Sequence, residues 1–342
     1  MTMDIQQNIS LKKLHTFGFD VKANQILHVY HENQLLTLPE DIKQHHHILG
    51  GGSNILICHD VDRTILKNEI KGIDIVAEND STVTVEVGAG ENWHQFVMWS
   101  ISHKLGGLEN LSLIPGTVGA APMQNIGAYG VEQNSCFVQL TAVDIQMGKI
   151  HTFTNDSCQF GYRESVFKRS AKGQYFITRV QYILKKKNYT PNISYGAIKE
   201  VLLSKGISAP DISDVSQAVI DIRTSKLPDP AIIGNAGSFF KNPVISTAHF
   251  KKLLDEFPDL PSYPAGIDSV KVPAGWLIEK SGLKGYKTGH VGVHQHQALV
   301  LVHFGEGKGS EILSLSNKII DTVWQNFNVR LEREVNIWND NF

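Results

Sequence analysis

The chain has 342 residues, of which 42% are hydrophobic and 19% charged, and its formal net charge is −2. This composition is typical of a globular protein with two or three compact units, and it argues against a disordered or fibrous chain. The near-neutral charge gives no general attraction to nucleic acid or to an anionic membrane, so an anionic ligand must be bound by local donors and a few placed cations.

The first residues and the cysteines indicate the cellular compartment in which the protein is expected. Residues 1–13 are polar and lack the apolar core of a secretory signal, and no stretch approaches the ~18 uncharged apolar residues that a membrane helix needs. Cys58, Cys136 and Cys158 are odd in number and widely spaced. They are expected to be reduced core thiols, not a disulfide framework or a zinc site, and the predicted location is the cytoplasm.

Short strands punctuated by glycine dominate the first half. Residues 47–57 are apolar, then glycine-rich, then apolar again, which indicates two strands joined by a tight loop. Residues 81–90 alternate with their valines on one face, and further strands are predicted at 137–146 and 175–184. A helix is predicted within 91–105, where the apolar residues at helical spacing are Trp93, Phe96, Val97 and Ile101.

The second half mixes helices and strands. Helices are predicted at 213–223 and around Phe250, Leu253, Leu254 and Phe257, and the apolar run 297–304 predicts a buried strand. A last helix is predicted at 317–327, with four side chains facing inward: Ile320, Val323, Trp324 and Phe327. The fold class is therefore α+β, and the polar stretch 185–210 is the predicted boundary.

Two loops are rich in glycine and other small residues. Residues 50–54 (Gly-Gly-Gly-Ser-Asn) offer consecutive backbone N–H groups for a diphosphate, although a plain tight turn explains them equally well. Residues 115–122 and 124–130 form a longer segment of small residues. Neither loop has the spacing of a Walker phosphate loop or of a Rossmann fingerprint. Two separate loops suit a large dinucleotide bound in an extended form on another fold.

These motifs resemble the FAD-binding half of the UDP-N-acetylenolpyruvoylglucosamine reductase family, in the class that has a mobile tyrosine loop. The resemblance covers nearly the whole chain. It implies an FAD-binding fold of the vanillyl-alcohol oxidase/p-cresol methylhydroxylase type, followed by a C-terminal α+β substrate-binding domain. Some relatives have serines where this chain has Ala120 and Ala121, so the resemblance implies that two hydroxyl contacts to the flavin phosphates are lost here while the backbone approach is kept.

The resemblance also implies domain limits and cofactor contacts. Residues 1–188 are the expected FAD-binding region, with subdomains of about 1–70 and 71–188; residues 189–212 are the tyrosine loop and linker. Residues 213–342 are the expected substrate-binding domain, with its last strand and helix packing back on the FAD region. Non-covalent FAD is expected to contact Gly50, Gly51, Gly52, Ser53, Asn54, Pro115, Gly116, Gly119, Gln124, Asn125 and Gly127.

Three catalytic residues follow from the same resemblance. Arg163, in Gly-Tyr-Arg-Glu-Ser, corresponds to an arginine that holds the substrate carboxylate, a group that guanidinium grips in a bidentate way. Ser238, in Asn-Ala-Gly-Ser-Phe-Phe-Lys-Asn-Pro, corresponds to the acid that protonates the substrate carbon. Glu334 corresponds to the catalytic glutamate, but Glu332 falls on the same face of a strand, so spacing alone does not choose between them.

Substrate contacts are implied for Tyr162 beside the arginine, Tyr195 in the mobile loop, Lys226 at the UDP diphosphate, Asn242 and Gln297. The implied reaction uses NADPH to reduce FAD, and then reduces UDP-N-acetylenolpyruvoylglucosamine to UDP-N-acetylmuramate for peptidoglycan precursors. Without the resemblance, a surface ion-pair arginine, a turn serine and solvated carboxylates are the simpler interpretations.

Two other functions stay open at this stage. A related FAD-dependent sugar or alcohol oxidase explains the glycine-rich loops but gives no role to the Tyr195, Lys226 and Ser238 segments. A nucleotide-sugar-binding protein that has lost its flavin is a third reading. The histidines at 45–47, 290, 294 and 296 lack a supporting carboxylate or cysteine set, so no catalytic metal is predicted. The chain is expected to act as a monomer, without nucleic-acid or membrane partners.

Overall fold

The computed structural model describes residues 4–339 and divides the chain into two compact units. Unit 1 comprises residues 1–9, 23–52 and 61–225, and unit 2 comprises residues 10–22, 53–60 and 226–342. Unit 2 is therefore assembled from three stretches, two of which come from the first sixty residues. No described helix is both long and apolar enough to cross a membrane.

Unit 1 is built on a four-stranded and a five-stranded sheet, with β8 and β9 forming a separate antiparallel pair. The four-stranded sheet has the order β1-β2-β5-β3, and β5 runs parallel to both β2 and β3. The five-stranded sheet has the order β11-β10-β12-β7-β6 and its neighbouring strands are antiparallel. The strands are β1 (Asp4–Ser10), β2 (Lys22–Val29), β3 (His46–Leu49), β5 (Thr64–Asn68), β6 (Ile73–Glu78), β7 (Thr82–Gly88), β8 (Gly127–Ala128), β9 (Val131–Glu132), β10 (Phe137–Asp144), β11 (Lys149–Thr154) and β12 (Tyr175–Lys185).

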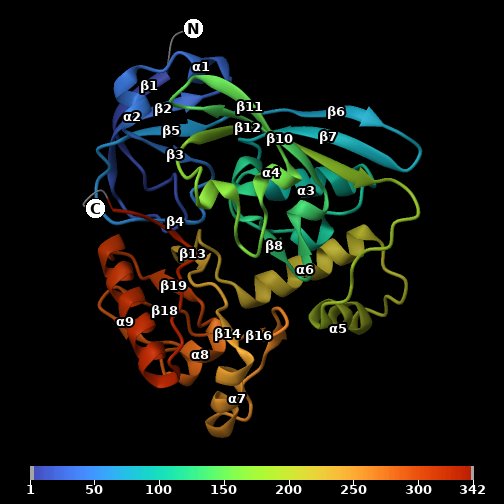
Figure 1. Ribbon diagram of the computed structural model, residues 1–342, viewed down its shortest axis with the longest axis vertical. Helices are drawn as coiled ribbons and strands as arrows, with labels where there is room; N and C mark the ends of the chain where they lie inside the picture. The colour runs from blue at the N-terminus through green and yellow to red at the C-terminus, as the bar shows by residue number, and fades with distance from the viewer. Residues whose placement is uncertain (1–3, 340–342) are drawn as a thin grey trace. The chain divides into compact units, whose positions relative to one another are not determined.

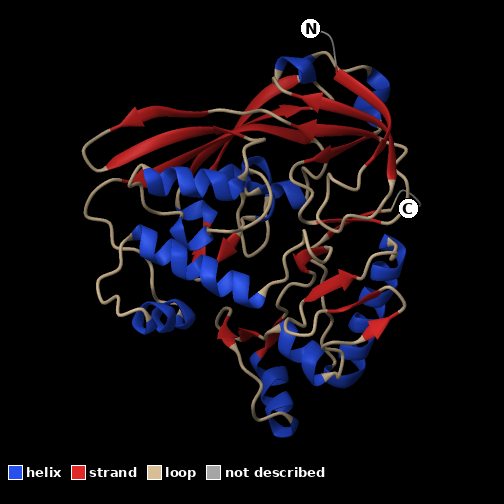
Figure 2. Ribbon diagram, turned by 180° about the vertical axis from the view of Figure 1, so that it is seen from behind, coloured by secondary structure: helices blue, strands red, loops and turns tan. Residues whose placement is uncertain are grey.

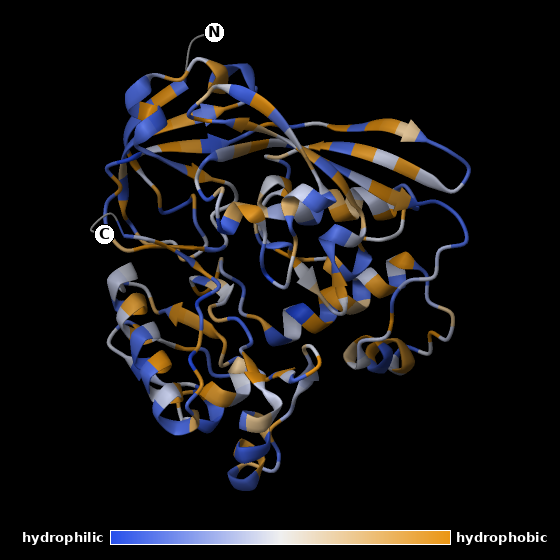
Figure 3. Cartoon of the chain, viewed as in Figure 1, coloured by the Kyte–Doolittle hydropathy of each residue, from blue (hydrophilic) through white to orange (hydrophobic). Residues whose placement is uncertain are grey.

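The helix α3 (Trp93–Ser102) covers one face of the five-stranded sheet (Figures 1 and 2). All four of its predicted inward residues are buried, and Val83, Val85 and Val87 of β7 are buried beneath it. The hydropathy colours alternate along β7 as this one-sided burial requires (Figure 3). The other helices of unit 1 are α1 (Asn33–Leu36), α2 (Glu40–Gln44), α4 (Asn155–Cys158), α5 (Gly196–Ser204) and α6 (Ile212–Lys226, whose last residue belongs to unit 2).

Unit 2 packs its helices and small sheets around one apolar core. A four-stranded sheet has the order β13-β19-β18-β17, a three-stranded sheet has the order β14-β16-β15, and β20 pairs in parallel with β4. Its elements are β4 (Ile55–Ile57), β13 (Asn235–Ser238), β14 (Val244–Ser246), α7 (Thr247–Glu256), β15 (Tyr263–Pro264), β16 (Ser269–Lys271), α8 (Ala274–Lys280), β17 (Lys287–Thr288), β18 (Val291–Val293), β19 (Val300–His303), α9 (Gly309–Phe327) and β20 (Asn336–Trp338).

The structure corrects the predicted last helix. The helix α9 begins at Gly309, eight residues before the predicted start, and Trp324 is 49% exposed instead of facing inward. The buried stripe of α9 follows the helical repeat through Ile312, Leu315, Ile319, Val323 and Phe327. Trp324 follows Val323 by one residue, about 100° around the helix, and therefore lies outside that stripe.

Candidate functional site

The two glycine-rich loops of unit 1 touch each other. An added Cβ on Gly51 would lie 2.7 Å from the Cα of Gly116, and one on Gly50 would lie 2.7 Å from Oγ1 of Thr117. A side chain at Gly51 would therefore require the facing backbone to move, and one at Gly50 would require the Thr117 side chain to move. Among the described residues, the N–H groups of Gly51 and Gly116 have no hydrogen-bond acceptor. The closely apposed loops thus present bare backbone donors, as an anion-binding site requires.

Thr117 adds an unsatisfied hydroxyl to these loops. The residue is 8% exposed, and its Oγ1 is buried without a hydrogen-bond partner among the described residues. It precedes the short 3-10 helix Val118–Ala120 without capping that helix through its side chain. Buried hydroxyls are normally hydrogen-bonded, so an orphaned one calls for a ligand atom. A phosphate oxygen fits this donor and the backbone donors around it, so the loops fit the diphosphate of FAD.

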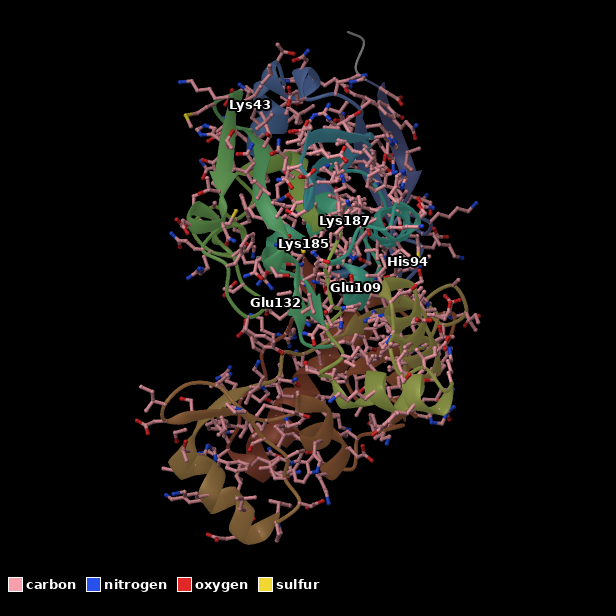
Figure 4. The ribbon with its side chains drawn as sticks, turned by 90° about the vertical axis from the view of Figure 1, so that its right-hand side faces the viewer. Lys43, His94, Glu109, Glu132, Lys185 and Lys187 are labelled. Atoms are coloured by element: carbon pink, nitrogen blue, oxygen red, sulfur yellow. The ribbon has the colours of Figure 1, made fainter. Side chains whose placement is uncertain are left out.

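Asn125 holds the second loop in place. It is fully buried in a left-handed conformation (φ 45°), and its Nδ2 donates to Oε2 of Glu132 at 2.8 Å and to the carbonyl of Gly161 at 3.2 Å (Glu132 is labelled in Figure 4). Its Oδ1 accepts from the backbone N–H of Asn134 and from Gln133. The side chain is therefore engaged by the protein, and a contact from Asn125 to the cofactor would come from its backbone.

Arg163 lies against the same loop. Its guanidinium donates from Nη2 to the carbonyl of Gly127 at 2.6 Å and lies 5.4 Å from the ring centre of Tyr162. Arg163 itself has a left-handed backbone (φ 53°), which a non-glycine residue adopts only when its surroundings enforce it. The predicted substrate arginine, its neighbouring tyrosine and the end of the predicted flavin loop thus come together within unit 1.

Tyr195 stands at the start of α5 with 45% of its surface exposed, and its ring contacts Tyr129 edge-on at 5.2 Å. The segment leading to it is fastened at two points. Tyr189 donates its hydroxyl to Oε1 of Glu109 at 2.6 Å, and the Asn110 side chain donates to the carbonyl of Asn192 at 2.8 Å. The exposed Tyr195 therefore follows a segment that two hydrogen bonds attach to the rest of unit 1.

In unit 2 the serine and the glutamates lie on neighbouring chain segments. The N–H of Glu334 donates to the carbonyl of Phe239 at 2.9 Å, and the N–H of Lys241 donates to the carbonyl of Glu332 at 2.9 Å. Ser238 ends β13 directly after Gly237, whose φ of 68° lies where the pairing of β13 with β19 shifts in register between Asn235 and Ser238. Asn54 Nδ2 donates to the Glu334 carbonyl at 3.3 Å, so the end of the first glycine loop also meets this segment.

The side chains of the two glutamates differ in their surroundings. The Glu332 carboxylate is 71% exposed and accepts a hydrogen bond from Nζ of Lys241 at 2.5 Å. Glu334 is half-buried and lies across from Phe239, next to the predicted catalytic serine. The Glu332 carboxylate is thus engaged by a lysine of the neighbouring segment.

The other predicted substrate residues are spread over their units. Lys226 is exposed at the end of α6. Asn242 accepts through Oδ1 from the N–H of Ala274 at the start of α8, at 3.0 Å, and Gln297 accepts through Oε1 from the N–H of Leu299 at 3.4 Å. Their amide groups can still donate to a ligand while their oxygens hold local backbone.

Sequence reasoning missed Thr117, although it named Gly116 and Gly119 on either side. The signal was present, because Thr117 is the sole hydroxyl residue in 115–122. The structure also contains a cavity of about 580 Å³ lined by residues of β12 and of the segments that follow β2 and β5, among them Lys71 and Arg179. None of the predicted site residues lines it. Among residues 4–339, no group of histidine, cysteine, aspartate and glutamate side chains is placed to hold a metal ion.

Comparisons with known proteins cover the whole chain. The family model described as "UDP-N-acetylenolpyruvoylglucosamine reductase, C-terminal domain" matches residues 229–338, and that described as "FAD binding domain" matches residues 26–154. A UDP-N-acetylenolpyruvoylglucosamine reductase of Flavobacterium johnsoniae is 49% identical over 98% of this chain and all of its own, and one of Pseudomonas aeruginosa is 44% identical over 99% of this chain and all of its own.

A solved structure has the same fold. The UDP-N-acetylenolpyruvylglucosamine reductase of Thermus caldophilus matches 99% of this chain and all of its own with a TM-score of 0.69, at 22% identity. At that identity the likeness concerns the fold alone. The predicted fold, an FAD-binding domain followed by a C-terminal α+β domain, is confirmed.

Proposed function

The chain belongs to the UDP-N-acetylenolpyruvoylglucosamine reductase family, and we propose that its catalytic groups are Arg163, Ser238 and Glu334. As a member of that family it is an FAD-dependent oxidoreductase. It reduces UDP-N-acetylenolpyruvoylglucosamine to UDP-N-acetylmuramate with NADPH, a step of peptidoglycan precursor synthesis. When bound, FAD would supply the hydride-transfer chemistry between NADPH and the enol ether, which no amino-acid side chain supplies.

The two apposed loops would hold the cofactor. The bare N–H groups of Gly51 and Gly116 and the unpartnered hydroxyl of Thr117 support a diphosphate contact there. The remaining contacts proposed for the cofactor come from the residues of these loops and of the adjoining turn: Gly50, Gly52, Ser53, Asn54, Pro115, Gly119, Gln124, Asn125 and Gly127.

Arg163 would bind the substrate carboxylate. Its guanidinium is already oriented by the Gly127 carbonyl, so little side-chain entropy is lost when it grips a second oxygen pair. Its permanent positive charge would stabilise the negative charge that builds up beside the carboxylate after hydride reaches the β-carbon. Tyr162, Tyr195, Lys226, Asn242 and Gln297 would bind the rest of the sugar nucleotide.

Ser238 would then give the proton of its hydroxyl to the α-carbon. A serine hydroxyl is a weak acid, and its proton transfer to the negatively charged α-carbon leaves an alkoxide on Ser238, so the step needs surroundings that stabilise that alkoxide. Glu334 would stabilise this arrangement from the neighbouring segment. The observation that carries the proposal is the pair of backbone hydrogen bonds between residues 239–241 and 332–334, which joins these two predicted groups within one structural unit.

Separate measurement of the two half-reactions tests this assignment. In anaerobic stopped-flow experiments, Ser238→Ala should keep flavin reduction by NADPH and lose reoxidation by the enol ether by about 100-fold or more, the range for a lost general acid. Ser314→Ala, an exposed helix serine of the same unit, is the matched control. An equal loss in both half-reactions would contradict the proton-donor role, and reoxidation by oxygen alone would indicate an oxidase.

We further propose a monomeric, cytoplasmic enzyme with domain limits at 188 and 212. The three cysteines are free and buried, as suits a reducing compartment. Light scattering should give the mass of one chain, cell fractionation should find the protein with the cytosol, and limited proteolysis should cut first within 189–212.

A further inference from the structure

Leu113 has an unusual backbone just before the second glycine loop. Its φ is 58°, in the left-handed region that non-glycine residues rarely occupy. Pro115 and Gly116 follow two and three residues later. The conformation of Leu113 therefore sets the direction in which the chain enters the segment that faces Gly50 and Gly51.

Two side chains hold the peptide groups of this residue. The N–H of Leu113 donates to Nδ1 of His94 at 3.0 Å, and Nε of Arg223 donates to the Leu113 carbonyl at 3.2 Å. His94 projects from the first turn of α3 (Figure 4) and Arg223 belongs to α6. Both hydrogen-bonding groups of a strained residue are thus bound by side chains from helices far from it in sequence.

The bond from Leu113 requires a neutral imidazole. A histidine nitrogen accepts a hydrogen bond only when it carries no proton, so Nδ1 of His94 must be bare. Burial, together with the positive charge of Arg223, lowers the pKa of His94 below its ordinary value of 6.5. Arg223 is the one charged group, among the described residues, that acts on this imidazole, and it also hydrogen-bonds with Tyr129.

We propose that His94 is a positioning residue for the flavin. By binding the Leu113 N–H it holds the 113–119 segment in the form that meets Gly50 and Gly51, so that the cofactor binds to loops already in place. The inference rests on the proposed flavin contacts of these loops. It implies that the affinity for FAD falls when the pH becomes low enough to protonate His94. The bond is intact at pH 6.5 and above, and it is lost as the pH falls through the lowered pKa of His94, where the imidazole takes up a proton.

The test uses two replacements of His94 and measures the dissociation constant of FAD by fluorescence. His94→Leu removes the acceptor and leaves the partly buried N–H of Leu113 without its partner, so the FAD dissociation constant should rise about tenfold at neutral pH. His94→Asn keeps an acceptor, Oδ1, close to the position of Nδ1 and does not titrate. This variant should bind FAD as the wild type does at neutral pH and should lack the wild-type loss of affinity below pH 6.5.

Two further variants distinguish a failure of the His94 inference from a failure of the proposed flavin contacts. His103→Asn changes an exposed histidine at the end of the same helix. It should alter neither the FAD dissociation constant at neutral pH nor its dependence on pH. Gly51→Ala tests the loops themselves: unchanged FAD affinity in that variant would overturn the flavin contacts, and the His94 inference with them. If Gly51→Ala weakens FAD binding, while the wild type and His94→Asn have the same pH dependence, the inference about His94 alone is wrong. That comparison stands even if His94→Leu does not fold.

Discussion

Replacing Thr117 with valine keeps the shape of the side chain and exchanges its hydroxyl for a methyl group. In the protein without cofactor this hydroxyl is buried and has no partner among residues 4–339. An unpaired buried hydroxyl costs about 1–3 kcal/mol, and the side chain caps no helix whose bond would be lost. Thr117→Val should therefore stabilise the apoprotein, by roughly 1–4 °C in Tm for a chain of this length.

The same substitution should weaken the binding of FAD. A hydroxyl that donates to a phosphate oxygen makes a charge-assisted hydrogen bond worth about 2 kcal/mol, so the dissociation constant should rise about 30-fold. Stability and affinity then change in opposite directions, which a general disturbance of the fold does not produce. Differential scanning fluorimetry of the apoprotein and titration with FAD followed by flavin fluorescence measure the two effects.

Thr64→Val is the matched control. Thr64 is 7% exposed, close to the 8% of Thr117, but its hydroxyl donates to Oε1 of Gln25 at 3.1 Å. This variant should lose about 1 kcal/mol of stability and leave FAD affinity unchanged. If Thr117→Val bound FAD as tightly as the wild type, the hydroxyl would not face the diphosphate. If it lowered apoprotein stability as Thr64→Val does, its oxygen would have a partner inside the protein.

Three further predictions concern other parts of the molecule. Gly51→Ala, whose Cβ would meet Gly116 at 2.7 Å, should raise the FAD dissociation constant by about tenfold or more in the same titration, whereas Gly196→Ala, with open space around it, should not. Glu334→Gln should slow flavin reoxidation by the enol ether by about 100-fold in stopped-flow measurements, whereas Glu332→Gln should change it less than about twofold; the reverse order would exchange their roles. Burial lowers the pKa of His15 below its ordinary value of 6.5. Below pH 6.5, His15 is therefore protonated in the unfolded chain while it is still neutral in the native state. Urea unfolding should therefore show stability falling below pH 6.5, with a shallower fall in His15→Leu; identical slopes would exclude this histidine as the cause.

Local patterns determined much of the secondary structure. Alternation of valines placed β7 and its buried face, and helical spacing identified all four buried residues of α3, because each pattern reflects the geometry of a single element. Contiguous motifs determined the cofactor and the family, since the glycine loops and the Ser238 segment are read without knowledge of the fold. The prediction that Trp324 faces inward was wrong, because the buried stripe of α9 runs through Val323 and leaves the adjacent Trp324 exposed.

Contacts between distant residues were decided by the tertiary structure alone. The sequence does not state that Gly51 touches Gly116, that Asn54 binds the carbonyl of a residue 280 positions away, or that Lys241 engages Glu332. Each depends on how strands from separate parts of the chain pair, which a one-dimensional pattern does not encode. The left-handed Leu113 is a further case. Leucine has no local preference for that conformation, and the hydrogen bonds that enforce it come from His94 and Arg223 on two other elements.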